Sequence, residues 1–107
     1  MRTAALAMIF TAATATAATA QTDRLTDVEY LQAARCAGLA SSETLGEIDT
    51  AGVDALLKAE ARGRSGFIVD KAEKARKDVE RIADRAQAGR KAGLLAEREQ
   101  SCQRYYG

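Results

Sequence analysis

The sequence contains no proline, no histidine and no tryptophan, and only five of its 107 residues are aromatic. Proline is the residue that most strongly interrupts helices, so its absence leaves long helical segments possible throughout the chain. Alanine, leucine, glutamate, lysine and arginine dominate the composition, and all are strong helix formers. Strand signals, which need alternating β-branched and aromatic residues, are nearly absent. The composition therefore predicts an all-α protein.

The lack of histidine also bears on function. It removes the usual general base, the usual partner of a catalytic serine or cysteine, and the commonest metal ligand. Acidic pairs at helical spacing do occur, namely Asp23 with Asp27, Glu43 with Glu47, and Glu80 with Asp84. Such pairs are common on solvated helices, and no dense acidic loop accompanies them. We predict a non-catalytic protein with no cofactor and no metal, and keep a small hydrolase or metal-dependent enzyme as a remote alternative.

The first 20 residues have the order of a secretory signal peptide. Arg2 is their only charged residue, an alanine-rich apolar stretch follows, and small residues close it at Ala18-Thr19-Ala20. Five threonines make this stretch too polar for a membrane-spanning anchor. We predict a signal peptide over residues 1–20, a single domain over residues 21–107, and a periplasmic or secreted location without a stable membrane anchor. The alternative is an N-terminal helix of a cytosolic protein.

Charge is balanced overall but unevenly distributed. The chain has 16 basic and 15 acidic residues, so removal of Arg2 with the signal peptide leaves a net formal charge of zero. No general field favours nucleic acid or an anionic membrane, and nucleic acid is not expected as a partner. Residues 21–70 are mainly acidic and residues 71–107 mainly basic. We interpret these as two halves packed antiparallel in one molecule; the alternatives are self-association and a basic docking face for an acidic partner.

Large apolar residues are scarce. Residues 21–107 contain only 16 Leu, Ile, Val and Phe residues among 87, beside 15 alanines. Full burial of one such side chain contributes roughly 1.5–3 kcal/mol, whereas ordering each residue costs about 1–2 kcal/mol. The domain therefore needs additional support from a covalent link, from a partner, or from both.

Cys36 and Cys102 are the only cysteines. An exported chain meets an oxidising compartment, and two widely separated cysteines without a C-x-x-C motif are poorly suited to redox catalysis. We predict one intramolecular disulfide, worth roughly 4 kcal/mol for a loop of this length. The alternative is an intermolecular bond.

Capping signals mark the start of the first helix. Thr26 and Glu29 have the spacing of a capping box, in which each side chain satisfies a backbone N–H at the helix start. Val28, Cys36 and Leu39 then fall on one broad apolar face at 100 degrees per residue. Cys36 is therefore predicted to point inward.

Further signals place the second and third helices. Thr44 and Glu47 repeat the capping-box spacing, and residues 53–57 supply the clearer apolar part of a second helix. This helix is predicted to end near residues 63–66. Ser65 is the predicted N-cap of a third helix.

The third helix carries a stripe of mostly small apolar residues at alternating spacings of four and three. Its members are Ile68, Ala72, Ala75, Val79, Ile82 and Ala86, continued by Gly89, Gly93 and Ala96. We predict that this stripe is a packing or interaction seam that permits close approach of another helix. Gly89 and Gly93 predict a bend, after which the third and last helices form a long hairpin or bent rod. The disulfide then ties the first helix to the C-terminal end of this hairpin.

Two tyrosines, Tyr105 and Tyr106, stand close to Cys102. Exposed paired aromatics beside a disulfide would make a small docking point. Burial against Tyr30 or Leu39 is the alternative that we prefer.

These features predict a small hairpin or bundle of three to four helices that follows a cleaved signal peptide and is closed by one disulfide. The expected function is protein–protein interaction, as an accessory subunit or a homo-oligomeric module, so the partner is another protein or a second copy. The alternative is a small envelope stress holding chaperone that exposes apolar surface on partial unfolding.

Overall fold

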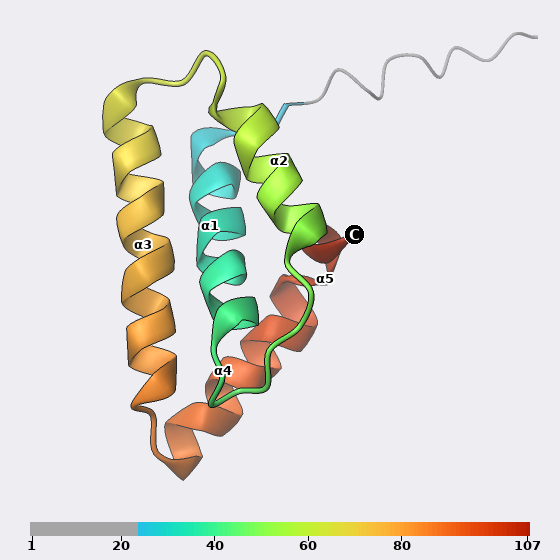
Figure 1. Ribbon diagram of the computed structural model, residues 1–107, viewed down its shortest axis with the longest axis vertical. Helices are drawn as coiled ribbons and strands as arrows, with labels where there is room; N and C mark the ends of the chain where they lie inside the picture. Colours follow the sequence, from blue (N-terminus) through green and yellow to red (C-terminus); the bar gives the residue numbers. More distant parts are fainter. Residues whose placement is uncertain (1–23) are drawn as a thin grey trace, which may run out of the picture.

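Helices account for all the regular structure in the computed structural model, which describes residues 24–107 (Figure 1). They are α1 (Asp27–Ser41), α2 (Ala51–Ala61), α3 (Gly66–Asp84), α4 (Ala88–Ser101) and the short α5 (Gln103–Tyr106). A disulfide joins Cys36 to Cys102. The all-α fold closed by one disulfide is thus confirmed. The predicted signal peptide lies outside the described residues.

Helix α1 is the centre of the structure. All four other helices pack against it, and its most extensive contact is with α3. Its buried residues are Tyr30, Ala33, Ala34, Cys36, Ala37, Gly38, Leu39 and Ala40. A helix that is buried on several sides is apolar around its circumference rather than along one stripe. The predicted single face was therefore wrong in one member, because Val28 points outward and is 76% exposed.

Small side chains bring α1 and α3 together. A Cβ atom added to Gly38 would lie 2.3 Å from the carbonyl oxygen of Arg76 and 2.4 Å from Cγ1 of Val79. Opposite, α3 buries Ala72, Val79 and Ala83. Because these positions carry small side chains or none, the two backbones approach closely and gain dispersion contacts that larger side chains would prevent. Close packing of alanine and glycine is thus how the domain forms a core from few large residues.

Helices α1 and α3 run parallel. Tyr30 and Ala72 share one buried cluster toward their N-terminal ends, and Ser42 donates a hydrogen bond of 2.7 Å to Asp84 at their C-terminal ends (Figure 1). The prediction of antiparallel halves was therefore wrong. The cause is α2, which runs back along α1 and returns the chain to the start of α1 before α3 begins.

The complementary charges of the two halves are nevertheless used within the molecule. Asp54 pairs with Arg76 at 2.8 Å, and Glu29 pairs with Arg104 at 3.4 Å. Each pair joins an acidic residue of the first half to a basic residue of the second.

Two of the three predicted helix caps are present. Thr26 and Glu29 form the reciprocal capping box, and the Ser65 hydroxyl accepts a hydrogen bond from the N–H of Ile68. The capping box at Thr44 and Glu47 was wrong, because this segment is a loop and α2 begins only at Ala51.

Tertiary contacts explain that loop. Gly46 adopts a φ of +91°, a left-handed conformation that suits glycine. The Arg98 guanidinium donates hydrogen bonds to the carbonyls of Leu39, Leu45 and Gly46. A helix over this segment would lose these contacts.

The break between α3 and α4 falls at residues 85–87, before the predicted bend at Gly89 and Gly93. Asp84 accepts hydrogen bonds from Ser42 and Thr44 through its side chain, and Thr44 also donates to its backbone carbonyl. These bonds satisfy the C-terminal end of α3, where the last carbonyls have no partner within the helix. Both glycines lie within α4, and no atom of another element lies close to either.

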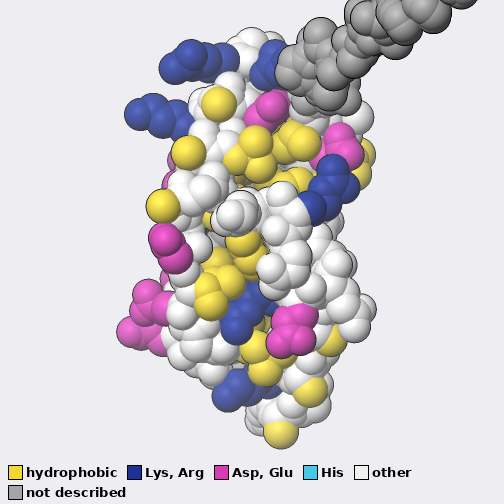
Figure 2. Space-filling view, turned by 90° about the vertical axis from the view of Figure 1, so that its right-hand side faces the viewer, with side chains coloured by type: hydrophobic (Ala, Val, Ile, Leu, Met, Phe, Trp, Pro, Cys, Tyr) yellow, Lys and Arg dark blue, Asp and Glu magenta, His cyan; other side chains and the backbone are white. Residues whose placement is uncertain are grey.

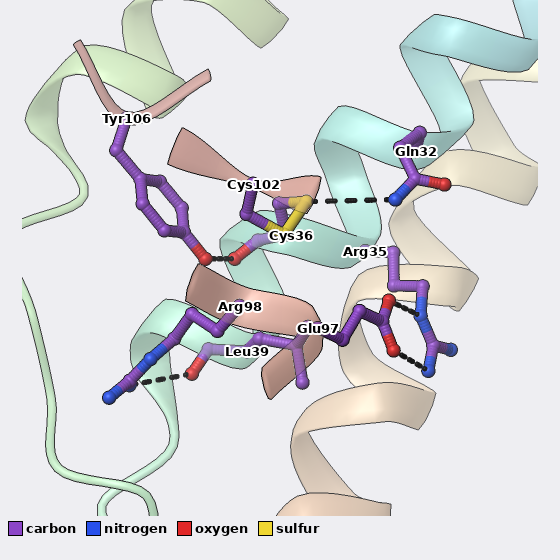
Figure 3. The surroundings of a disulfide bond; sticks show 8 residues. All are labelled: Gln32, Arg35, Cys36, Leu39, Glu97, Arg98, Cys102 and Tyr106. Carbon is purple, nitrogen blue, oxygen red and sulfur yellow. Dashed lines mark hydrogen bonds and ion pairs between the residues drawn. A yellow bond between two sulfur atoms is a disulfide. The ribbon is translucent and has the colours of Figure 1, made fainter. Parts of the chain in front are cut away.

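Of the predicted long hairpin or bent rod, a hairpin with α3 and α4 packed together is not what α3 and α4 form. They hardly touch each other, because α4 diverges from α3 and packs against α1 instead (Figure 1). Around the disulfide, Tyr106 donates a hydrogen bond of 2.6 Å to the carbonyl of Cys36, and Arg35 pairs with Glu97 (Figure 3). These polar contacts and the disulfide hold the C-terminal segment to α1.

Replacement of Gly38 by alanine tests the close approach of α1 and α3. The new methyl group would clash with backbone and force the helices apart, so we expect a loss of about 1–3 kcal/mol in the free energy of unfolding. Urea unfolding of the oxidised protein measures this loss. Gly93→Ala is the matched control, with open space around the position and an expected gain of up to about 1 kcal/mol. Equal stability of both variants would contradict the packing described.

Removal of the disulfide tests the covalent support. The Cys36→Ser/Cys102→Ser variant loses a link that closes a loop with a sequence separation of 66 residues. We expect a loss of roughly 4 kcal/mol in the free energy of unfolding. Thermal unfolding by circular dichroism, compared with that of the reduced wild-type protein, checks this. Unchanged stability on reduction would show that noncovalent contacts suffice.

Candidate functional site

Helix α3 is packed on one side only. It contacts α1 along its length but hardly touches α2 or α4, and it stands at one edge of the molecule (Figure 1). Each flank of α3 is therefore open. One flank borders a groove against α1, and the other a cleft against α2.

The first opening, which we call the α1–α3 groove, has a volume of about 310 Å³. It is lined by Val28, Leu31, Gln32 and Arg35 from α1 and by Lys71 and Ala75 from α3. Most of its lining atoms are apolar. Ala75 is the member of the predicted seam that reaches it.

Two large apolar side chains stand out from the surface beside this groove. Val28 is 76% exposed and Phe67 is 72% exposed. Phe67 lies one turn before Lys71, whose ammonium is 5.9 Å from the centre of the phenyl ring. An exposed phenylalanine next to an apolar groove is a usual mark of an interaction site.

The two basic residues that line the groove differ in their ion pairing. Arg35 forms a two-pronged pair with Glu97, with hydrogen bonds of 2.5 and 2.9 Å, and these bonds raise the pKa of Arg35. Lys71 has no carboxylate partner among residues 24–107. The groove therefore offers one unpaired cation beside an apolar surface.

The second opening, which we call the α2–α3 cleft, has a volume of about 400 Å³. Tyr30 of α1 forms part of its floor, Leu57 and Val69 are on its two walls, and Lys58 and Lys77 line it as well. The cleft thus has two lysines in its lining, whereas the lining of the α1–α3 groove has one lysine and one arginine.

Arg64, in the loop between α2 and α3, links α1 to α2 near this cleft. Its side chain is only 8% exposed, and it pairs with Asp27 at 2.6 Å and with Glu60 at 2.8 Å. It also donates to the carbonyls of Leu25 and Glu60, and its guanidinium lies 4.6 Å from the ring centre of Tyr30. Burial alone would raise the pKa of Glu60, but hydrogen bonds from Arg64 and from the N–H of Leu25 hold it below its usual value.

The predicted seam is divided between two environments. Ala72 and Val79 are buried against α1, whereas Ile68, Ala75 and Ala86 are half-buried. Ile82 is 38% exposed, and Ala83 occupies the buried position beside it. The central part of the seam thus packs inside the molecule.

The C-terminal tyrosines do not form an exposed pair. Tyr105 is 5% exposed and belongs to the cluster that contains Leu39. Tyr106 is half-buried, and burial raises its pKa to about 12. Tyr105 is therefore buried in one cluster with Leu39, as in the interpretation that we preferred.

Several members of the predicted acidic pairs have other surroundings, and Asp23 lies outside the described residues. Asp27 pairs with Arg64, Asp84 accepts from Ser42, and Glu43 and Glu47 lie on an exposed loop. No group of three or more potential metal ligands occurs among residues 24–107.

The face opposite α3 shows no patch of one charge. Figure 2 shows hydrophobic side chains along the middle of this face, with basic and acidic side chains scattered around them. Within the part of the chain that the structure describes, no helix has the length and apolarity required to cross a bilayer.

Sequence reasoning missed Gly38, Arg64 and Phe67. The small-residue run of α1 signalled close packing at Gly38, and Phe67 could have been found because it falls outside the seam on its helix. Nothing in the sequence marks Arg64 among the other arginines.

Comparisons with protein-family models, with curated proteins and with solved structures give no match for this chain.

Replacement of Glu60 by glutamine tests the Arg64 network. Because the folded-state pKa of Glu60 is lowered, its ionised form stabilises the protein above the unfolded-state pKa, and this contribution is lost as the pH falls through the folded-state value. We expect Glu60→Gln to cost about 1–3 kcal/mol at pH 7 and less below about pH 4. Urea unfolding at several pH values measures this difference. Glu99→Gln, at an exposed position, should stay within about 0.5 kcal/mol at every pH.

Proposed function

We propose that this protein is a non-catalytic, exported helical protein that acts by binding another protein through the α1–α3 groove. The observation that carries this proposal is the exposure of Val28 and Phe67 beside an apolar groove. Within residues 24–107 nothing covers them. Their burial on binding would contribute roughly 1.5–3 kcal/mol each.

The structure changes the basis of this proposal. From the sequence, a partner was expected because the chain has few large apolar residues with which to form a stable core. The buried alanines of α1 and Gly38 give α1 and α3 a packed interior, and the disulfide ties α1 to the end of α4. Support for binding now comes from the surface, where α3 leaves an apolar flank open.

The groove suits an amphipathic helix of the partner. Helix-in-groove recognition uses apolar side chains one turn apart, and the groove presents Val28, Leu31 and Ala75 along two parallel helices. Lys71 has no ion-pair partner within the described residues, so an acidic residue of the partner would complement it. The proposed role is that of an accessory subunit or, if the partner is a second copy, of a homo-oligomeric module.

Site-specific photocrosslinking tests this proposal. A photoreactive phenylalanine at position 28 or 67 in the source cell should yield one discrete crosslinked species, which mass spectrometry identifies as a foreign protein or a second copy. The same residue at Ile48, an apolar loop position that is 37% exposed, should yield none. Phe67→Ser should abolish the product from position 28 without lowering the melting temperature, because Phe67 is exposed. Equal crosslinking from all three positions, or from none, would contradict the proposal.

A further inference from the structure

We propose that the α1–α3 groove is one end of a longer docking surface, which follows the same flank of α3 to the α3–α4 corner and binds a strongly acidic amphipathic helix of another protein. This inference rests on the proposed function, because it names the partner of the same surface. The added part, which we call the α3–α4 hollow, has a volume of about 390 Å³. It is lined by Ile82, Arg85, Ala86, Gln87 and Arg90.

The spacing of the lining residues places both openings on one flank of α3. Ala75, in the groove, follows Lys71 by four residues, and Ile82, in the hollow, follows Ala75 by seven. Residues four or seven positions apart lie on the same side of a helix. Phe67, four residues before Lys71, begins this row. The flank that faces the α2–α3 cleft carries a different set, which includes Val69, Glu73 and Lys77.

Each end of this flank exposes a large apolar side chain. Phe67 is 72% exposed at one end, and Ile82 is 38% exposed at the other. Ala75 and Ala86 are half-buried, and the exposed lining of the hollow is mainly apolar, like that of the groove. Helix α4 diverges from α3 beyond the corner and has few contacts with it (Figure 1). The flank therefore offers apolar contacts at both ends of α3.

The length of the flank sets the length of the partner segment. From Phe67 to Ile82, α3 rises by about 22 Å at 1.5 Å per residue, which is about four helical turns. From Phe67 to Ala75, where the groove ends on α3, the rise is only about 12 Å. A partner helix that follows the whole flank thus contacts both Phe67 and Ile82, and needs at least about 15 residues.

The charged side chains of this flank are basic. Lys71, Arg85 and Arg90 line it, and none of them forms an ion pair with any of residues 24–107. Arg35, the remaining basic residue of the lining, is held by Glu97. No acidic residue of the described chain lines either opening. Unpaired cations along an apolar surface favour a partner with several carboxylates, more of them at the end that meets the hollow.

A second copy of this chain is a poor match for this surface. The carboxylates of α1 and α2 all pair within the molecule: Asp27 and Glu60 with Arg64, Glu29 with Arg104, and Asp54 with Arg76. Neither α3 nor α4 has more acidic than basic residues. No helix among residues 24–107 therefore offers the excess of free carboxylates that the flank would complement, so the partner is a different protein.

Photocrosslinking from both ends of the flank tests this inference. A photoreactive phenylalanine at position 67 and, in a separate variant, at position 82 should capture the same foreign protein in the source cell. Mass spectrometry should place the two crosslinked residues of that protein in one acidic segment, about 12–18 residues apart, because about 22 Å correspond to about 15 helical residues. The same probe at Lys77, on the opposite flank, should capture nothing. Equal capture from position 77 would contradict a specific surface.

The outcomes separate this inference from the proposed function. If positions 28 and 67 capture a protein that position 82 does not, the proposed function stands and the longer surface is wrong. Capture of a second copy, or crosslinked residues outside one acidic segment, would also overturn the inference. Capture from position 82 alone, or from none of the three positions, would overturn both.

Charge reversal tests the basic end of the surface. Arg85→Glu/Arg90→Glu should lower the crosslinking yield from position 67 by about tenfold or more, because two favourable pairs become repulsive. Lys58→Glu/Lys77→Glu makes the same change in charge at the α2–α3 cleft and should alter the yield less than twofold. All four side chains are exposed, so both variants should keep the wild-type melting temperature. Equal effects on the yield would reduce the attraction to net charge and overturn the role of the hollow.

Discussion

The structure depends on how closely other helices can approach α1. Half of its eight buried residues are alanine, with Gly38 at the tightest contact. A central helix of this kind presents little bulk in any direction, so α2, α3, α4 and α5 can all reach it. Larger residues would give more apolar area but push the surrounding helices outward. The domain instead gains from short interhelical distances and many dispersion contacts.

Two long arginine side chains and one disulfide bond connect the helices in addition to the small apolar core. Arg64 joins the start of α1 to the end of α2, and Arg98 joins α4 to the loop that follows α1. Both guanidiniums satisfy backbone carbonyls that would otherwise need water. The Cys36–Cys102 bond fixes the end of α4 to α1.

The same construction leaves α3 with two open flanks. A helix of 19 residues that packs on a single neighbour exposes the sides that a bundle would cover. The flanks differ in chemistry: one carries the exposed Val28 and Phe67, and the other is lined by Lys58 and Lys77 above the buried Tyr30.

The sequence by itself determined the helical class, the caps at Thr26 and Ser65, and the disulfide. These follow from local propensity, from spacing within one turn, and from the presence of only two cysteines. The small-residue stripe also signalled a close helix contact, although its register was off at Ile82.

Only the tertiary structure decided which helix is central, that α1 and α3 are parallel, and where α3 ends. Helix direction depends on the path of α2, and the break after Asp84 depends on Ser42 and Thr44, which are some 40 residues away in the chain. The two openings beside α3 likewise exist because α2 and α4 pack mainly on α1 and have few contacts with α3. No local pattern contains this information, because it arises from contacts between distant segments.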